Sequence, residues 1–227
     1  MIQDQKLGPV LVVAPHPDDE TLGAGGFLLR CRDEGRAVHW LIVTAMNPDD
    51  GWHADKIKKR SVEIANVAAA YEFESVTELG FATAKLDTVP KSELIAAIGE
   101  AVNLIEPETI LIPHRDDAHS DHAAVHDAAA ACCKWFRYPT VKDVLVYETL
   151  SETDAAIHSS APFHPTLFID ITNQIEMKLK ITSMYGDEIG EMPFPRSLTA
   201  IEALATVRGA ASGYLAAESF MILRSRS

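Results

Sequence analysis

The chain has 227 residues, of which 47% are hydrophobic and 23% are charged, the composition of an ordinary globular protein. Its formal net charge of −13 at pH 7 argues against nucleic acid or an anionic membrane as the main partner, because both require a basic surface. The three cysteines are an odd number without CxxC spacing, so we expect reduced thiols buried in helices of a cytoplasmic protein.

The length favours a single domain spanning residues 1–227, because no linker, internal repeat or low-complexity segment divides the chain. No apolar run approaches the ~20 residues of a membrane-spanning helix, and the N-terminus lacks the pattern of a signal peptide. We therefore expect a soluble protein without a membrane span.

The predicted elements alternate between short apolar strands and longer helices with an apolar face. In chain order they are strand 10–14, helix 22–34, strand 38–44, a helix over about 57–69, strand 75–80, helix 90–105, strand 109–113, helix 123–133, strands 141–147 and 166–171, helices 173–185 and 197–211, and a last edge strand at 219–223.

This alternation predicts an α/β fold with a Rossmann-like, mostly parallel sheet and helices on both faces. In a Rossmann-like strand order, the first and fourth strands are neighbours at the point where the order reverses. Ligands bind at that point, outside the carboxyl ends of the strands. We therefore expect the catalytic loops to be those that follow strands one and four.

A dense polar loop, APHPDDE, follows the first predicted strand at Ala14–Glu20. It places one histidine and three carboxylates within five residues, and its two prolines stiffen the backbone. Massing acidic groups costs electrostatic repulsion, which a bound cation relieves. The loop therefore predicts a metal site.

A second polar loop, HRDDAHSDH, follows the fourth predicted strand at His114–His122. If the strand order is Rossmann-like, the two loops face each other. His16 and Asp19 then combine with His122 into a set of two histidines and one carboxylate. Such a set leaves a coordination position free for water, as in catalytic zinc sites. We expect one zinc ion per chain.

A zinc hydrolase also needs a base that takes a proton from water and a donor that stabilises the oxyanion. Asp18 suits the base, because it lies beside a predicted ligand and is free to point inward. His119 lies three residues before His122 and suits the donor if it is protonated. Asp121 could orient His119 and hold its charge.

The motifs Ala14–Glu20 and His119–His122 resemble those of the PIG-L/LmbE-like family of zinc-dependent N-deacetylases, which act on N-acetylglucosamine-containing substrates. The resemblance implies that His16, Asp19 and His122 bind zinc. The catalytic residues that it implies are Asp18 as general base, His119 as oxyanion stabiliser and Asp121 as the group that orients His119.

Further segments extend this resemblance over most of the chain. The segment RSVE at Arg60 resembles the family's arginine-bearing helix, whose arginine contacts substrate, and segments at Arg196, Arg208 and Glu218 resemble its C-terminal part. The resemblance implies substrate-binding roles for Arg60, Arg196 and Glu218. The chain departs from many members at 47–51, where NPDDG stands in place of a Gly-Glu pair.

Plainer interpretations exist for several of these residues. Arg60 fits equally well as half of a surface ion pair with Glu63 or Glu74, and Glu218 fits a structural role. His126 is expected to face solvent or to lie behind the metal ligands, where Asp117 could also lie. The remaining histidines are expected to lie at the surface or to be paired: His39, His53, His114, His158 and His164.

Other classes of protein fit parts of the pattern. His16-x-Asp18 with His122 also matches the facial triad of non-haem iron(II) oxygenases, but those enzymes usually have all-β barrels. A Mg²⁺-dependent receiver-like domain would leave His119 and His122 unexplained. A non-catalytic carbohydrate- or metal-binding module would be expected to lack the base, whereas Asp18 is present.

We therefore expect a zinc-dependent amidohydrolase that removes an acetyl group from an N-acetylated amino sugar or sugar conjugate of the N-acetylglucosamine type. The expected partners are this small-molecule substrate and further copies of the chain in a homo-oligomer.

Overall fold

The computed structural model describes residues 8–157 and 160–227, so the first seven residues of the predicted domain and His158 lie outside the described residues. Within them, seven strands form one sheet in the order β3-β2-β1-β4-β5-β7-β6. The predicted α/β fold with a mostly parallel sheet is confirmed.

The first five strands are parallel and follow the expected Rossmann-like order. Val10 pairs with Val38 on one side and with Thr109 on the other, so the first strand lies between the second and the fourth. The two polar loops therefore leave the sheet at neighbouring strand ends. These strands are β1 (Val10–Ala14), β2 (Val38–Ala45), β3 (Ser75–Ala82), β4 (Thr109–Pro113) and β5 (Asp143–Tyr147).

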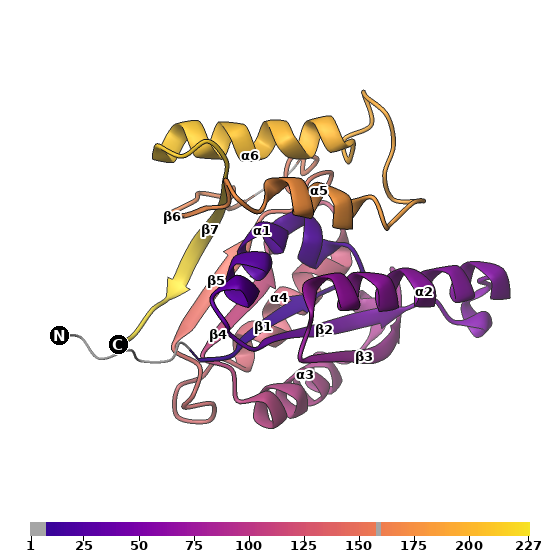
Figure 1. The fold of residues 1–227 in the computed structure, drawn as a ribbon. Helices are drawn as coiled ribbons and strands as arrows, with labels where there is room; N and C mark the ends of the chain where they lie inside the picture. The colour runs from indigo at the N-terminus through magenta and orange to yellow at the C-terminus, as the bar shows by residue number, and fades with distance from the viewer. Residues whose placement is uncertain (1–7, 158–159) are drawn as a thin grey trace.

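Helices cover both faces of the sheet (Figure 1). One face carries α1 (Asp19–Asp33), α2 (Ala54–Tyr71) and α5 (Ile175–Thr182), and the other carries α3 (Lys91–Ile105) and α4 (Ser120–Ala131). The last helix, α6 (Leu198–Ser212), packs outside α5 and against β7. Short 3-10 helices occupy Pro48–Asp50 and Leu86–Thr88.

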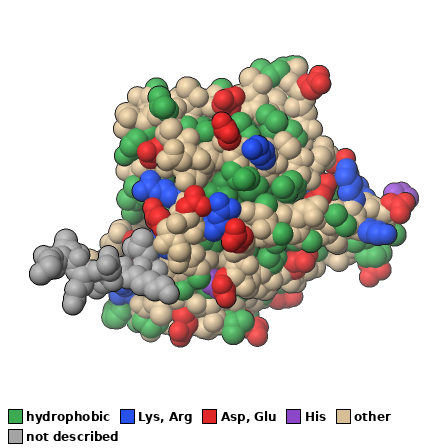
Figure 2. Space-filling view, in the orientation of Figure 1, with side chains coloured by type: hydrophobic (Ala, Val, Ile, Leu, Met, Phe, Trp, Pro, Cys, Tyr) green, Lys and Arg blue, Asp and Glu red, His purple; other side chains and the backbone are tan. Residues whose placement is uncertain are grey.

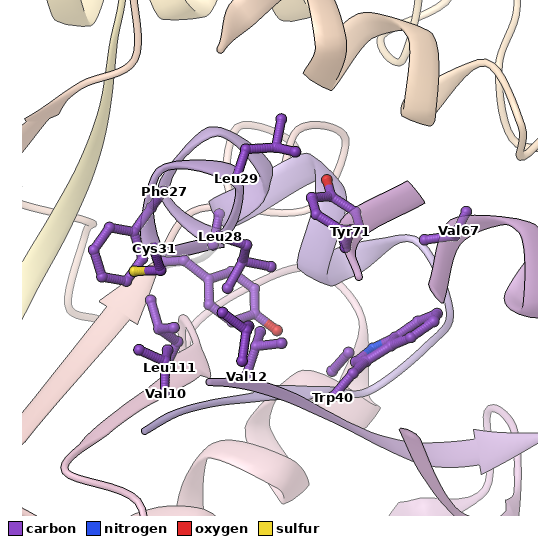
Figure 3. Close-up of a cluster of buried hydrophobic side chains, with 14 of the residues drawn as sticks. Val10, Val12, Phe27, Leu28, Leu29, Cys31, Trp40, Val67, Tyr71 and Leu111 are labelled. Carbon is purple, nitrogen blue, oxygen red and sulfur yellow. The ribbon is translucent and has the colours of Figure 1, made fainter. Parts of the chain in front are cut away.

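The core has one layer on each side of the sheet, because successive side chains of a strand point to opposite faces. Val10 and Val12 of β1 belong to the layer that contains Phe27 of α1 and Trp40 of β2 (Figure 3). Leu11 and Val13 belong to the layer beneath α3 and α4. All five residues of β1 are fully buried, as expected for a parallel strand that is covered on both faces.

The last strand is not the edge strand that the sequence predicts. β7 (Ala217–Arg224) lies between β5 and β6 (Leu167–Asp170) and is antiparallel to both, which leaves β6 at the edge. The interior position buries Phe220 completely and brings its ring centroid to 5.6 Å from that of Phe27 on α1. Burial of this aromatic pair gives a physical reason for the inner position.

Three helices begin earlier than predicted: α1, α2 (at Ala54 rather than Ile57) and α4. The changes in α1 and α4 matter for the site. α1 begins at Asp19 rather than Leu22, because the carbonyl of Asp18 accepts hydrogen bonds from the N–H groups of Thr21 and Leu22. α4 begins at Ser120 rather than Ala123. Asp19 and His122 therefore lie on the first turns of two helices, which are more rigid than loops.

None of the helices in the described part of the chain combines the length and the apolar character that a membrane crossing requires. On the face drawn in Figure 2, acidic and basic side chains are interspersed rather than gathered into patches of one sign.

Candidate active site

The loop between β1 and α1 has an unusual backbone. Asp18 adopts a φ of 151°, a conformation that L-residues other than glycine rarely adopt. Its N–H donates to a carboxylate oxygen of Glu20 at 3.1 Å, and the preceding carbonyl, of Pro17, accepts a hydrogen bond from Arg60 at 3.0 Å. Buried polar contacts on both sides therefore hold the loop in this conformation.

Three of the predicted residues form a compact cluster. Asp19 lies between the two histidines, with Oδ2 at 3.3 Å from His16 Nδ1 and Oδ1 at 3.4 Å from His122 Nε2. The ligand atoms of the three residues all lie within 4.8 Å of one another. His122 is fully buried, and Asp19 is 3% exposed. The tertiary structure thus brings together the set that the sequence predicts.

A second layer of carboxylates holds the two imidazoles from behind. His16 Nε2 lies 3.0 Å from Asp121 Oδ2, and His122 Nδ1 lies 2.7 Å from Asp117 Oδ2. Asp117 in turn accepts a hydrogen bond from the hydroxyl of Thr153 at 2.6 Å. Carboxylates placed behind histidine ligands fix the orientation and tautomer of the rings and raise their basicity.

The charges of the cluster are strongly coupled. Burial lowers the pKa of His16, but hydrogen bonds to Asp121 and Asp19 outweigh it and raise that pKa to about 9. Burial likewise opposes the charge of His122, yet Asp19 and Asp117 raise its pKa to about 10. Burial would raise the pKa of Asp19, and the two imidazoles instead hold it well below its usual range. Positive charge, from protons or from a divalent cation, therefore stabilises these buried carboxylates.

The donor set fits a divalent metal. His122 Nε2 is buried and has no hydrogen-bond partner among the described residues, although buried polar atoms are nearly always paired. Two imidazoles and one carboxylate are ligands that zinc accepts, and they leave an open position. His16, Asp19 and His122 are therefore the residues that could hold the ion. A second group of facing ligand atoms, His16 with His119 and Asp121, shares only His16 with this set.

Asp18 lies beside this cluster and contacts a cation on another segment. Its side-chain Oδ2 accepts a hydrogen bond from Arg196 at 3.1 Å, and the residue is 4% exposed. Burial and the charge of Asp19 raise the pKa of Asp18 well above its usual range, while Arg196 opposes the rise. The structure thus places Asp18 at the cavity with Oδ2 held by Arg196.

Asp121 contacts His119 through both its backbone and its side chain. The backbone N–H of Asp121 donates to His119 Nδ1 at 3.1 Å, and the carboxylate Oδ2 lies 3.9 Å from the same nitrogen. The carboxylate also contacts His16 and accepts from the N–H groups of Ala84 and Leu86 at 2.7 and 3.1 Å. Burial lowers the pKa of His119. With Nδ1 accepting, a neutral ring carries its proton on Nε2, so His119 can donate a hydrogen bond without being protonated.

The cluster borders a cavity of about 320 Å³. His16, Asp18, Asp19 and His119 line this cavity, together with Arg60 and Arg196. The other lining residues come from the β1–α1, β2–α2, β3 and C-terminal segments: Pro17, Thr44, Ala45, Met46, Trp52, Ile57, Ser61, Ile64, Glu78, Thr83, Glu152 and Glu188.

Arg60 both lines the cavity, as a substrate contact would, and forms an ion pair. It lines the cavity, but it is only 7% exposed and its guanidinium is engaged on several sides. Nε lies 3.4 Å from Glu63, Nη1 donates to the Pro17 carbonyl, and Nη2 contacts Glu188. The expected ion pair with Glu63 is present, in a buried rather than a surface position.

Glu218 lies outside the cavity, and its predicted role as a substrate contact is corrected. Its two carboxylate oxygens each accept a backbone N–H of α1 at 2.7 Å, from Gly26 and Phe27. Lys178 Nζ lies 2.7 Å from the same side chain. Glu218 is 5% exposed. It therefore connects α1, α5 and β7, a structural role.

The other histidines that the structure describes lie away from the cluster. His126 Nδ1 contacts the Pro113 carbonyl at 2.8 Å, and His39 Nδ1 contacts the Ser75 hydroxyl at 2.8 Å. The two exposed ones are His53 and His164. The remaining one, His114, is buried, with its ring centroid 5.6 Å from that of Phe163.

Sequence reasoning missed Trp52, Glu78 and Glu188 as residues of the cavity. Trp52 carries a detectable signal, because a tryptophan in a polar loop at the carboxyl end of a strand has no core to fill. Glu188 carries no such signal, since it lies in an irregular segment between α5 and α6 and reaches the cavity only through tertiary packing.

Comparisons with known proteins agree with this geometry. The sequence profile of the PIG-L family, described as GlcNAc-PI de-N-acetylase, matches residues 11–133, a range that contains both polar loops. An uncharacterized deacetylase of Escherichia coli K12, YaiS, is 27% identical over 147 residues, covering 63% of this chain and 74% of the relative. The diacetylchitobiose deacetylase of Thermococcus kodakarensis is 24% identical over 228 residues, covering 92% and 80%.

Solved structures share the fold. A conserved protein from Thermus thermophilus superposes with a TM-score of 0.77 at 25% identity, covering 96% of each chain. A 4-carboxy-2-hydroxymuconate hydratase of Pseudomonas putida superposes with a TM-score of 0.73 at 16% identity, covering 97% of this chain and 98% of its own. Since one of these folds belongs to a hydratase, the fold alone does not determine the reaction.

Proposed function

The chain belongs to the PIG-L family of de-N-acetylases and is an N-deacetylase, and from that premise we propose that it removes the acetyl group from an N-acetylated amino sugar or sugar conjugate of the N-acetylglucosamine type, with zinc as its metal. The observation that carries the proposal is the largely buried His16–Asp19–His122 cluster beside a cavity that Asp18 and His119 line. Ionisable groups beside an open metal position suit amide hydrolysis.

The zinc ion, when bound, would act as a Lewis acid that polarises the acetyl carbonyl and makes water more acidic. Asp18 accepts the proton of the attacking water. Arg196 holds Oδ2 of this carboxylate at 3.1 Å, which leaves Oδ1 for the proton. The proton then passes from Asp18 to the leaving nitrogen as the C–N bond breaks. The hydroxyl remains on the acetyl carbon, so the products are acetate and a free amine.

His119 donates a hydrogen bond to the oxygen that becomes negative in the transition state. The contact between its Nδ1 and the N–H of Asp121 orients the ring and leaves Nε2 as the donor. Asp121 and Asp117 position the ligands His16 and His122 from behind. The side chains of the site therefore divide the work between proton transfer, charge stabilisation and support of the metal.

The test is amine release from a panel of N-acetylated sugars by protein of measured metal content. We expect amine from N-acetylglucosamine or N,N′-diacetylchitobiose with about one zinc per chain, loss of activity on chelation, and recovery when zinc is returned. If the zinc-loaded protein releases no amine from any member of the panel, the substrate class is wrong. If iron(II) restores activity and zinc does not, the metal is wrong.

The cytoplasmic location, the homo-oligomer and the single domain over residues 1–227 stay predictions. The last of these is tested below through the cysteines.

A further inference from the structure

A single carboxylate, that of Glu188, contacts both arginines of the cavity. Glu188 contacts Arg60 through Oε1, and its Oε2 lies 3.4 Å from Arg196 Nη2. The two guanidinium groups have further partners in Glu63, Asp18 and the Pro17 carbonyl. An anionic substrate group would therefore have to compete with Glu188 for either arginine.

The other charged side chains of the cavity wall are acidic. Two more glutamates line it, Glu78 from β3 and Glu152 from the segment after β5, and neither has a salt-bridge partner within the residues that the structure describes. Burial raises the pKa of Glu152, whereas Glu78 is exposed. Lys56 lies beside Trp52, a residue of the cavity, with Nζ 5.2 Å from the centroid of its ring.

Five carboxylates and two arginines thus line this cavity. With all five carboxylates ionised, a divalent cation at the histidine–aspartate cluster and the two arginines would still leave one negative charge in excess. Like charges brought together across a binding surface cost several kcal/mol, and a cavity with a net negative charge discriminates between ligands by charge. The cavity can therefore discriminate between neutral and anionic ligands without a steric barrier.

We infer that this site selects uncharged or cationic N-acetyl amino sugars and rejects those that carry a phosphate or carboxylate, and that Glu188 is the residue that sets this selectivity. The inference rests on the proposed function and narrows its substrate class. Glu188 acts on specificity by occupying Arg60 and Arg196, which would otherwise be the anion-binding groups of the cavity.

The experiment compares kcat/KM for N-acetylglucosamine with that for N-acetylglucosamine 6-phosphate. For the native enzyme we expect the neutral sugar to be favoured by about 100-fold, which corresponds to a few kcal/mol of repulsion. The preference should shrink as salt is added, because salt screens the repulsion. In Glu188→Gln the ratio should move toward the phosphorylated sugar by about tenfold or more. The substitution preserves size, so steric exclusion would not respond to it.

Glu191→Gln is the matched control. Glu191 lies in the same segment between α5 and α6 but is exposed and does not line the cavity, so the ratio should not change. Glu78→Gln removes a charge from the cavity wall without changing a contact of either arginine. If Glu188→Gln does not fold, an unchanged ratio in Glu78→Gln contradicts the charge selectivity.

The outcomes separate the two proposals. If no sugar of the panel releases amine, the proposed function fails. If amine is released but the phosphorylated sugar is used as well as the neutral one, only the charge selectivity fails. It also fails if the neutral sugar is preferred and the ratio is the same in Glu188→Gln and Glu78→Gln as in the native enzyme.

Discussion

Asp18 borders the cluster and His122 belongs to it, and the two residues make different kinds of contact. Asp18 accepts a hydrogen bond from Arg196. His122 Nε2 is buried, has no hydrogen-bond partner among the described residues, and is therefore free to bind a metal. Replacement of each should therefore have a different effect on metal content. The variants Asp18→Asn and His122→Ala separate the two roles.

We expect Asp18→Asn to keep its zinc and to lose about 10²–10⁴-fold in kcat, the typical contribution of general acid–base catalysis. His122→Ala should lose zinc as well as activity, because two protein ligands rarely hold the ion tightly. Metal analysis and amine release measure both, with circular dichroism as the control for folding. If the purified Asp18→Asn variant contains no zinc, Asp18 is a ligand and Asp19 becomes the candidate base.

Trp52 is the aromatic residue best placed to contact a sugar. It lines the cavity, and the ammonium of Lys56 lies over its ring. Aromatic contacts contribute about 0.5–1.5 kcal/mol beyond burial of their area. We expect Trp52→Ala to raise KM by about tenfold and to leave kcat nearly unchanged, the pattern of lost uniform binding. Trp135→Ala is the control, since Trp135 is 63% exposed and does not line the cavity. Equal kinetics for the two variants would remove Trp52 from the substrate site.

At the scale of elements, the close approach of α1 to β5 holds the first catalytic loop in place. A Cβ at Gly23 would overlap the ring of Tyr147 and come within 2.9 Å of the carbonyl oxygen of Glu148. Tyr147 cannot easily move away, because it is fully buried and its hydroxyl donates to the carbonyl of Val13 at 2.9 Å. The glycine therefore permits a helix position that any side chain would disturb.

We expect Gly23→Ala to lower the free energy of unfolding, although alanine by itself favours a helix over glycine by about 1 kcal/mol. Overpacking of a tight core costs about 1–3 kcal/mol, and here the contact includes backbone. Urea unfolding measures the change. Asn103→Ala, at an exposed position of α3, should leave stability equal or slightly higher. A Gly23→Ala variant as stable as the native protein would show that α1 can shift freely.

At the scale of the whole molecule, the cysteines report on both layers of the core. Cys31 belongs to the layer beneath α1 and α2, while Cys132 and Cys133 belong to the layer beneath α3 and α4. All three are free and buried. Burial raises the pKa of Cys31 and of Cys133 to about 12, so at pH 8 the reactive thiolate is scarcely populated in the folded state.

If the chain is a single domain, the three thiols should become reactive in one transition. We expect no reaction with a thiol reagent in the native protein at pH 8 and simultaneous labelling of all three across the unfolding curve in urea. Mass spectrometry after a short labelling pulse assigns each site. Labelling of Cys31 at a lower urea concentration than Cys133 would indicate two units that unfold separately.

Much of the fold could be predicted from the sequence because its signals are local. Continuous apolar runs of strand length lie between helices with an apolar face, and this alternation specifies a parallel sheet with helices on both faces. The bounds of β1 and β4 agree with those predicted. The Rossmann-like order then places His16, Asp19 and His122 together, because parallel strands direct their following loops to one edge of the sheet.

Other features depended on contacts between segments far apart in the chain. The position of β7 inside the sheet, the partner of Asp121 and the structural role of Glu218 are of this kind. The pattern of residues shows that a strand or a carboxylate is present, but its partner is selected by packing and by the need to pair buried polar groups. Glu188 is the extreme case, since it lies 128 residues from Arg60 in an irregular segment. The residues of the candidate metal site were therefore determined by the sequence itself, whereas the charges that line the cavity beside it were decided only by the tertiary structure.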